Sequence, residues 1–358
     1  VDWTQQVNGV TPSGSAVDRF AWGASYDHVY TPSSTLVLNL RAGFAEWGRN
    51  WRPFTYGVLG AVDFPFSDQF LKQVGPEKFL PGIGGNGFSS IGGGTVRFLR
   101  QYKYAFQPNV NWFKGDHRIK FGYDYRIDLD NDLRLGNSQG NFTFDATYTR
   151  GPSQDSGSMP GQGLASLLLG LPSGGSLGFG QGRANRMTYH GFYFQDDWRV
   201  SSRRTLNLGV RWDMDTPRWE RQNHQSGFDG RVMNPVAGVP GVITFSGRDG
   251  RSKYAHDFDT NNFSPRVGFA YRTGNKTVLR GGYGIFYLGS YTNVVAILTN
   301  GFGDNASFES PDGGFTPAFL FRNGLPAAIR EELGPGFGAV RAGQAPRMST
   351  GFLQQNHP

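Results

Sequence analysis

The stretch that decides the fold is Ile119-Lys120-Phe121-Gly122-Tyr123-Asp124-Tyr125-Arg126-Ile127. Apolar and aromatic residues occupy every odd position, and charged residues or glycine occupy every even position. A period of two places successive side chains on opposite faces of a β-strand, so this stretch predicts a strand with one apolar and one polar face. A polar turn, Lys114-Gly115-Asp116-His117, precedes it, and the chain before that turn alternates in the same way from Val96. The sequence therefore predicts an antiparallel hairpin over residues 96–128.

Three further segments repeat this pattern of two alternating stretches joined by a short polar turn. The hairpins cover about residues 17–46, 187–213 and 262–287. Their turns fall at residues 31–34, 201–204 and 273–275. Four hairpins in succession predict an all-β antiparallel meander. Arg100 stands at an apolar position of its strand, and the sequence gives no reason for it.

The connections between the hairpins are long and rich in Gly, Pro, Asn and Ser. They cover about residues 47–95, 129–186, 214–261 and 288–358. Short turns that alternate with long loops are typical of outer-membrane barrels, which have short periplasmic turns and long extracellular loops. The predicted strands are long enough, because a tilted membrane-spanning strand needs about 9–11 residues. We therefore expect part of a large transmembrane outer-membrane β-barrel; a large soluble β-sandwich or propeller is the alternative.

Composition excludes several other classes of protein. The 358 residues include 53 Gly, 30 Phe, 15 Tyr and 8 Trp but no Cys, so a disulfide scaffold and a thiolate metal site are excluded. No run of 18 apolar residues occurs, which argues against a transmembrane helix. The net charge is +7, from 35 basic and 28 acidic residues. The basic residues are spaced singly rather than clustered, so we expect no nucleic-acid partner.

The two ends of the chain carry no start or stop signal. Val1-Asp2-Trp3 contains no initiator methionine, no basic region and no apolar region typical of a signal peptide. The last residues, Gln354 to Pro358, are polar and contain neither a strand pattern nor a cap. We expect the chain to be an internal piece of a longer protein.

Six segments, in this order along the chain, resemble the barrel of TonB-dependent receptors, and in particular the Oar-like subgroup of large outer-membrane proteins. The segments are Gly115–Gly122, Leu168–Pro172, Phe194–Val200, Thr205–Trp212, Ser264–Phe269 and Arg280–Gly284. The resemblance spans most of residues 17–290. Family barrels have about 22 strands, whereas the four hairpins supply about eight, and the sequence contains no recognisable plug domain, TonB box or terminal aromatic strand.

The resemblance implies a function in the cell outer membrane of a Gram-negative bacterium, namely the import of a solute that the sequence does not identify. It also implies three partners: outer-membrane lipid, a plug domain of the same full-length chain, and a TonB complex reached through an N-terminal part. The alternative is an outer-membrane adhesin or surface-display barrel whose long loops bind other surfaces. A plug domain and a TonB box in the full-length chain would favour import.

No arrangement of residues predicts an enzyme or a cofactor. Gly82-Ile83-Gly84-Gly85-Asn86-Gly87 matches G-x-G-x-x-G, but the residues that follow are a poor helix start, so we expect a loop rather than a phosphate site. The six His residues are dispersed, and no nucleophile elbow, zinc-protease motif or P-loop occurs. The apolar stretch Leu164–Leu171 is too short to span a membrane and predicts a helix that packs within its own loop, a partner surface being the alternative.

Three alternating acids, Asp128, Asp130 and Asp132, are the only weak candidates for a metal site, since carboxylates bind hard cations. An EF-hand loop would need Gly where Leu133 stands. A solvated strand end is the preferred interpretation, and we expect no metal.

The alternation also assigns side chains to the two faces of the barrel wall. A charge on the lipid face near the membrane centre costs about 2–4 kcal/mol, so the charged positions should face the lumen. The lumen-facing basic residues are Arg19, Arg41, Arg97, Lys103, Arg118, Lys120, Arg126, Arg199, Arg211, Arg266 and Arg280. The acids at equivalent positions are Asp27, Asp124, Asp128, Asp197 and Asp213. The lipid-facing aromatic residues are Phe20, Trp22, Tyr26, Phe98, Tyr102, Phe121, Tyr123, Trp212 and Phe269.

Eleven bases against five acids give this part of the wall an excess of six positive charges. Such a wall could attract an anionic solute, or it could hold a plug whose acidic groups pair with it. The family resemblance favours the plug. We further expect an open, curved sheet whose short turns gather at one rim and whose long loops gather at the other.

Overall fold

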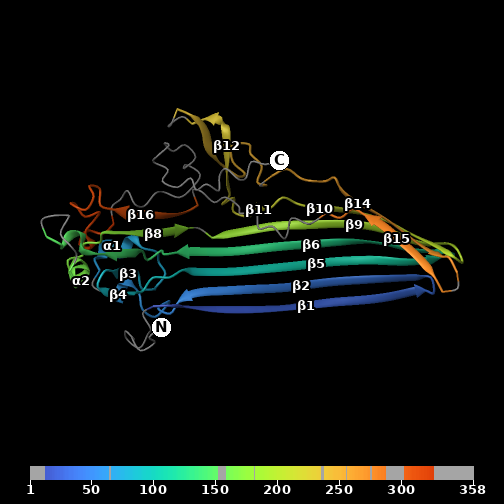
Figure 1. Cartoon of the computed structure of the whole chain (residues 1–358), viewed down its shortest axis with the longest axis horizontal. Coiled ribbons are helices and arrows are strands. Elements are labelled where there is room, and N and C mark those ends of the chain that lie inside the picture. Colours follow the sequence, from blue (N-terminus) through green and yellow to red (C-terminus); the bar gives the residue numbers. More distant parts are fainter. Residues whose placement is uncertain are drawn as a thin grey trace.

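The computed structural model describes residues 13–63, 66–151, 159–180, 182–234, 238–254, 256–274, 276–287 and 302–325. Its main feature is an antiparallel sheet of nine strands, eight of which lie side by side in chain order (Figure 1). These eight are β1 (Ser15–Ser33), β2 (Leu36–Pro53), β5 (Val96–Lys114), β6 (His117–Gly136), β9 (Arg183–Ser201), β10 (Arg204–Asp215), β14 (Asn262–Arg272) and β15 (Val278–Gly284). The ninth, β11 (Trp219–Glu220), pairs with β9 beyond the end of β10. The predicted all-β antiparallel meander is confirmed.

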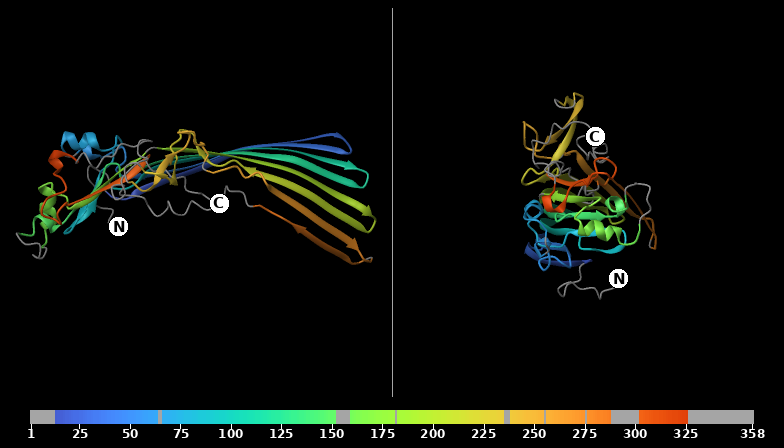
Figure 2. Two further views of the ribbon diagram at one scale, coloured as in Figure 1. Left: turned by 90° about the horizontal axis from the view of Figure 1, so that it is seen from above. Right: turned by 90° about the vertical axis from the view of Figure 1, so that its left-hand side faces the viewer.

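The sheet is open and curved, as expected, and β1 and β15 form its two edges (Figure 2). Short turns between paired strands lie at one end of the molecule, which we call the turn end. The connections that hold α1 and α2 lie at the opposite end, which we call the loop end, whereas the connection that holds β12 stands over the length of the sheet (Figure 1). At the turn between β5 and β6, Gly115 has φ +57°, a backbone conformation that a residue with a Cβ atom rarely adopts. Asn275, in the last predicted turn, lies outside the described residues.

The long connections are more ordered than the sequence predicted, because segments of three of them form a second sheet at the loop end. Its five strands are β16 (Gly303–Glu309), β8 (Gly174–Gly180), β7 (Asn141–Phe144), β3 (Gly82–Gly85) and β4 (Phe88–Ile91). The helical segments of these connections are α1 (Asp68–Gln73), α2 (Gln162–Leu168), η1 (Ala61–Asp63), η2 (Ala146–Tyr148) and η4 (Phe321–Asn323). We call this assembly the loop body. A separate hairpin, β12 (Ser226–Met233) and β13 (Pro240–Phe245), stands apart from both sheets (Figure 1).

Two predictions about the connections are settled by these elements. The glycine-rich stretch Gly82–Gly87 is not a loop: it forms strand β3 and the turn into β4, and no helix follows it. The apolar stretch Leu164–Leu171 does form a helix, α2. Only part of that helix packs inward, since Leu167 contacts the core of the loop body whereas Leu168 is 81% exposed.

The larger of two buried apolar clusters in the described residues lies in the loop body, and the smaller one lies on the β12–β13 hairpin. Phenylalanine rings from three connections meet in the larger cluster: Phe321 lies 5.3 Å from Phe70 and 4.6 Å from Phe142, measured between ring centroids. Phe308 lies 5.7 Å from Phe142. Aromatic pairs at such distances stabilise a fold beyond the area they bury. The loop body therefore has a core of its own.

The apolar face of the large sheet is exposed, which is the opposite of what a water-soluble sheet requires. Phe121 and Phe192 on this face are 42% and 49% exposed. Contiguous exposed apolar surface of this kind marks contact with a membrane or a partner. None of the helices in the described part of the chain is long and apolar enough to cross a membrane.

Arg100, unexplained in the sequence, stands on the apolar face near the loop end. Its guanidinium carbon lies 4.6 Å from the centre of the Phe20 ring, a cation–π contact. Its Nη1 donates a hydrogen bond of 2.8 Å to the side-chain oxygen of Asn50. These contacts give the Arg100 guanidinium partners within the sheet.

Candidate functional site on the charged face of the sheet

The strand register gathers the predicted charged residues on one face of the large sheet. Following the paired residues from β1 to β15 places all eleven predicted basic residues and all five acids on the same side, which we call the charged face. The nine predicted lipid-facing aromatic residues lie on the other side. That the charged face lines a lumen stays a prediction. The strands extend further than expected and add charged residues of both signs to this face: Arg49, Asp130, Asp132, Arg134, Arg183 and Asp215.

The aromatic face is a continuous surface of rings across neighbouring strands. Trp22 and Phe44 have ring centroids 4.9 Å apart, and Tyr123 and Phe192 are stacked at 4.4 Å. Phe192 in turn lies 5.7 Å from Trp212. Cross-strand aromatic pairs stabilise a sheet and suit the girdles of an outer-membrane barrel.

The first cluster on the charged face surrounds Asp132, whose side chain is 3% exposed. Arg97 on β5 donates two hydrogen bonds to the carboxylate, with Nε–Oδ1 and Nη2–Oδ2 distances of 2.7 and 3.0 Å. Arg134 on β6 and Arg183 on β9 donate to Oδ2 at 2.6 and 3.0 Å. One acid therefore joins three strands through three guanidinium groups, a strong arrangement because both partners are charged.

Asp132 lies toward the loop end, 13 residues after Ile119 and beyond the length that a membrane-spanning strand needs, about 9–11 residues. Burial disfavours its charged form. The hydrogen bonds from Arg97 and Arg134, together with their positive charges, outweigh burial and hold the pKa of Asp132 below its ordinary value. The carboxylate is therefore ionised at neutral pH.

The structure places the three candidate metal ligands on one face of β6, but it does not arrange them around a common point. They alternate along a single strand, Asp132 is occupied by arginines, and Asp130 accepts a 3.5 Å hydrogen bond from Gln101. In the ranges given above, no group of three or more His, Asp or Glu side chains could hold a metal ion.

The second cluster surrounds Asp124, nearer the middle of the sheet. Arg126 donates to its two carboxylate oxygens at 2.9 and 2.7 Å, and Gln107 donates to Oδ1 at 2.9 Å. Arg211 on β10 approaches Oδ2 at 3.4 Å. Asp124 is thus the point at which side chains of β5, β6 and β10 converge.

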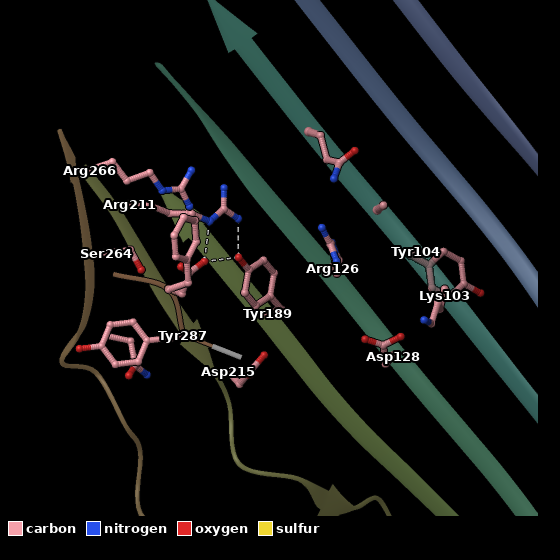
Figure 3. Close-up of a pocket in the computed structure, with 15 residues that line it drawn as sticks. Lys103, Tyr104, Arg126, Asp128, Tyr189, Arg211, Asp215, Ser264, Arg266 and Tyr287 are labelled. Atoms are coloured by element: carbon pink, nitrogen blue, oxygen red, sulfur yellow. Dashed lines mark hydrogen bonds and ion pairs between the residues drawn. The ribbon is translucent and has the colours of Figure 1, made fainter. Parts of the chain in front are cut away.

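Arg211 links this cluster to a second acid. Its Nε donates to Asp213 at 2.7 Å, and its Nη2 donates to the hydroxyl of Tyr189, which in turn donates to Asp213 (Figure 3). Gly191 provides the space for this, because a Cβ atom there would lie 2.5 Å from both Arg211 Nη2 and the Tyr189 hydroxyl. Arg211 is therefore held from two sides.

A cavity of about 500 Å³ opens over these residues on the charged face (Figure 3). It is lined by side chains of β5, β6, β9, β10 and β14 and by Phe286 and Tyr287, which follow β15. Arg211 and Arg266 point toward the same region of it (Figure 3). The alternation in the sequence predicts these two arginines on this face but does not predict Tyr189, Ser264 and Tyr287 as residues of the cavity. Tyr189 and Ser264 do fall on the polar parity of their strands, so the alternation contained a signal for their side of the sheet but none for their role.

Comparisons with known proteins give a family match and a distant structural similarity. The family model described as outer membrane beta barrel domain matches residues 3–357. No curated protein matches the chain. Among solved structures, the chain is similar to the closed form of the ferric-catecholate import receptor Fiu from E. coli K12, with 11% identity and a TM-score of 0.35. The similarity covers 83% of this chain and 38% of the receptor, so the chain spans well under half of that protein's length.

Proposed function

Because the chain belongs to the outer membrane beta barrel domain family and is located in the outer membrane, we propose that it forms part of the wall of a TonB-dependent receptor that imports a solute. An open sheet cannot stand alone in a membrane, since its edge strands expose unpaired backbone groups to hydrocarbon. Within the described residues, β1 and β15 each pair on one side only. Further strands must therefore complete the wall.

The observation that carries the proposal is the division of the sheet into an aromatic face and a charged face. Lipid accommodates the aromatic face but not the charged face, whereas a hydrated lumen accommodates the charged face. Bases exceed acids there, so the lumen we propose is positively charged and suits an anionic solute or an acidic plug segment.

We assign the turn end to the periplasm and the loop end to the cell exterior. The turns are short and the loop body is large, which is the usual asymmetry of outer-membrane barrels. The chain contains no cysteine, so a single introduced cysteine can be labelled specifically. A membrane-impermeant maleimide added to whole cells should label Arg248→Cys and leave Ser202→Cys unlabelled. Labelling of Ser202→Cys alone would invert the topology.

A second candidate function is surface display, and the loop body favours it. Its buried core of phenylalanines shows that the loops are built as a folded unit, which is what a binding surface for other cells or matrix requires. Under this proposal no energised import takes place.

The full-length protein distinguishes the two functions. We expect it to bind the periplasmic domain of TonB in a pull-down, and expect this binding to disappear when its N-terminal part is removed. Absence of TonB binding, combined with loss of cell adhesion when the loop body is replaced by a short linker, would favour display over import.

A further inference from the structure

One arginine in the cavity of the charged face lacks an acidic partner. Among the residues that the structure describes, no carboxylate lies within 4.0 Å of Arg266, whereas Arg126 and Arg211 each form ion pairs. The one contact recorded for the Arg266 guanidinium is with the Phe286 ring, at 4.6 Å from the guanidinium carbon to the ring centre. This contact fixes the plane of the guanidinium but leaves its donors unused.

A buried hydroxyl in the same cavity also lacks a partner. Ser264 is 1% exposed, and within the described ranges its Oγ has no hydrogen-bond partner. It stands directly across the β10–β14 ladder from Arg211 and two residues before Arg266, so the three side chains share one side of the cavity (Figure 3). A buried polar group without a partner costs free energy, and a ligand that accepts its hydrogen bond removes this cost.

Arg211 has a fixed position in the cavity, and its neighbours compensate most of its charge. Asp213, Asp124 and the Tyr189 hydroxyl hold its guanidinium, so its charge is largely compensated while its position is fixed. Asp128, Asp213 and Asp215 also line the cavity and would repel a ligand with two or more negative charges. The cavity lining contains four basic side chains, Lys103, Arg126, Arg211 and Arg266, against these three acids, an excess of one positive charge that matches a monoanion.

We propose that this cavity binds a carboxylate group. Arg266 holds the two carboxylate oxygens with its planar fork, the Ser264 hydroxyl donates to one of them, and Tyr287 covers the group from the side that follows β15. The inference rests on the proposed function to the extent that the charged face lines a lumen. The carboxylate belongs either to a free solute or to an acidic side chain from another segment of the full-length protein.

The first experiment measures binding of benzoate to the full-length protein in detergent micelles by saturation-transfer NMR, with benzamide as the neutral analogue and phenyl phosphate as the dianion. We expect benzoate alone to bind. Arg266→Gln should weaken binding about tenfold, the loss typical of one charge-assisted hydrogen-bonded pair, and Ser264→Ala should weaken it a few-fold. The matched control is Arg280→Gln, which removes a basic residue from the same face on β15 but outside the cavity.

The second experiment tests for an internal occupant. In the Arg266→Lys variant, a carbodiimide joins the lysine amine to a carboxylate that touches it, and mass spectrometry of the digest identifies the linked residue. If full-length protein fails to bind benzoate but residue 266 is linked to an acid outside the 358 residues, the site is occupied by the protein's own segment. If benzoate binds and no such link forms, the ligand is a free solute.

Either result supports a carboxylate site. The proposal is overturned if no link forms and benzoate binding is absent, or if Arg280→Gln weakens binding as much as Arg266→Gln. Circular dichroism of each variant shows whether it has folded, and the conservative Arg266→Lys change preserves the charge if Arg266→Gln does not fold. If the protein binds benzoate through Arg266 but does not bind TonB, the carboxylate site is supported and the proposed import function is refuted.

Discussion

Replacing the acid at the centre of the Asp132 cluster should destabilise the protein measurably. Asp132→Asn keeps the shape of the side chain but removes its charge and places an amide NH₂ group among three guanidinium groups. Four hydrogen bonds from Arg97, Arg134 and Arg183 converge on the two carboxylate oxygens. In the variant, each of the three arginines therefore loses the negatively charged acceptor to which it donates.

The size of the effect follows from burial. Removing one member of a fully buried ion pair costs about 3–5 kcal/mol. The arginine side chains here are 23%, 54% and 19% exposed, so water can replace part of what they lose. We expect Asp132→Asn to lower the free energy of unfolding of the full-length protein by about 2–3 kcal/mol, measured by urea titration in phospholipid vesicles.

The matched control is Asp27→Asn on the same face. Asp27 also accepts hydrogen bonds from an arginine, Arg41, but both side chains are well exposed. Its replacement should therefore have a much smaller effect. Equal effects of the two variants, or no effect of either, would refute the argument that burial makes the Asp132 cluster stabilising.

The pH dependence of the Asp132 effect has a definite sign. The folded-state pKa of Asp132 lies below its ordinary value, so its contribution to stability is fully present above the pKa in the unfolded chain, about 3.9. That contribution is lost as pH falls through the lower folded-state pKa. The stability difference between wild type and Asp132→Asn should therefore be constant from about pH 8 to pH 5 and shrink below about pH 4.

Three further substitutions test other parts of the structure. Phe121→Arg on the aromatic face should destabilise the membrane-embedded protein by about 2–4 kcal/mol, whereas Gln195→Arg on the charged face should have little effect; a lower urea midpoint for Gln195→Arg than for Phe121→Arg would mean that the faces are assigned the wrong way round. Phe142→Ala should cost about 3–5 kcal/mol within the loop body, because Phe142 is 2% exposed, and hydrogen exchange should rise in β7 and β8 but not in β5 and β6. Gly115→Ala should cost about 1–2 kcal/mol through its φ of +57° alone, since no atom lies within 4 Å of the added Cβ, and an unchanged urea midpoint would show that the turn adjusts.

The faces of the large sheet could be predicted from the sequence because a period of two is a local property. The alternation around Ile119 to Ile127 determines which side chains share a face. Once one hairpin is aligned, the register of pairing determines which side chains of the neighbouring strands lie on the same face. The same alternation did not predict the partners of Asp132. Arg183 follows Asp132 by 51 residues, so their contact depends on how β6 and β9 are aligned.

The loop body could not be predicted for a related reason. Phe70, Phe142 and Phe321 meet in one core although more than 250 residues separate the first from the last. Each lies in a stretch rich in Gly, Pro and Asn that has no sustained period, so the sequence indicated loops. Only the packing of one connection against another shows that these phenylalanines form a core.

The position of Ser264 in the proposed site depends on the strand register and not on its local sequence. As a small polar residue in an alternating strand, it carries no signal beyond its side of the sheet. The register places it opposite Arg211, and Arg211 is held in place by Asp213 and by the space that Gly191 leaves. The paired charges therefore act as a rigid frame in which Arg266 and Ser264 keep unused hydrogen-bonding capacity. A wall built only for stability would pair these groups within itself, so their availability is what indicates a ligand at this place on the charged face.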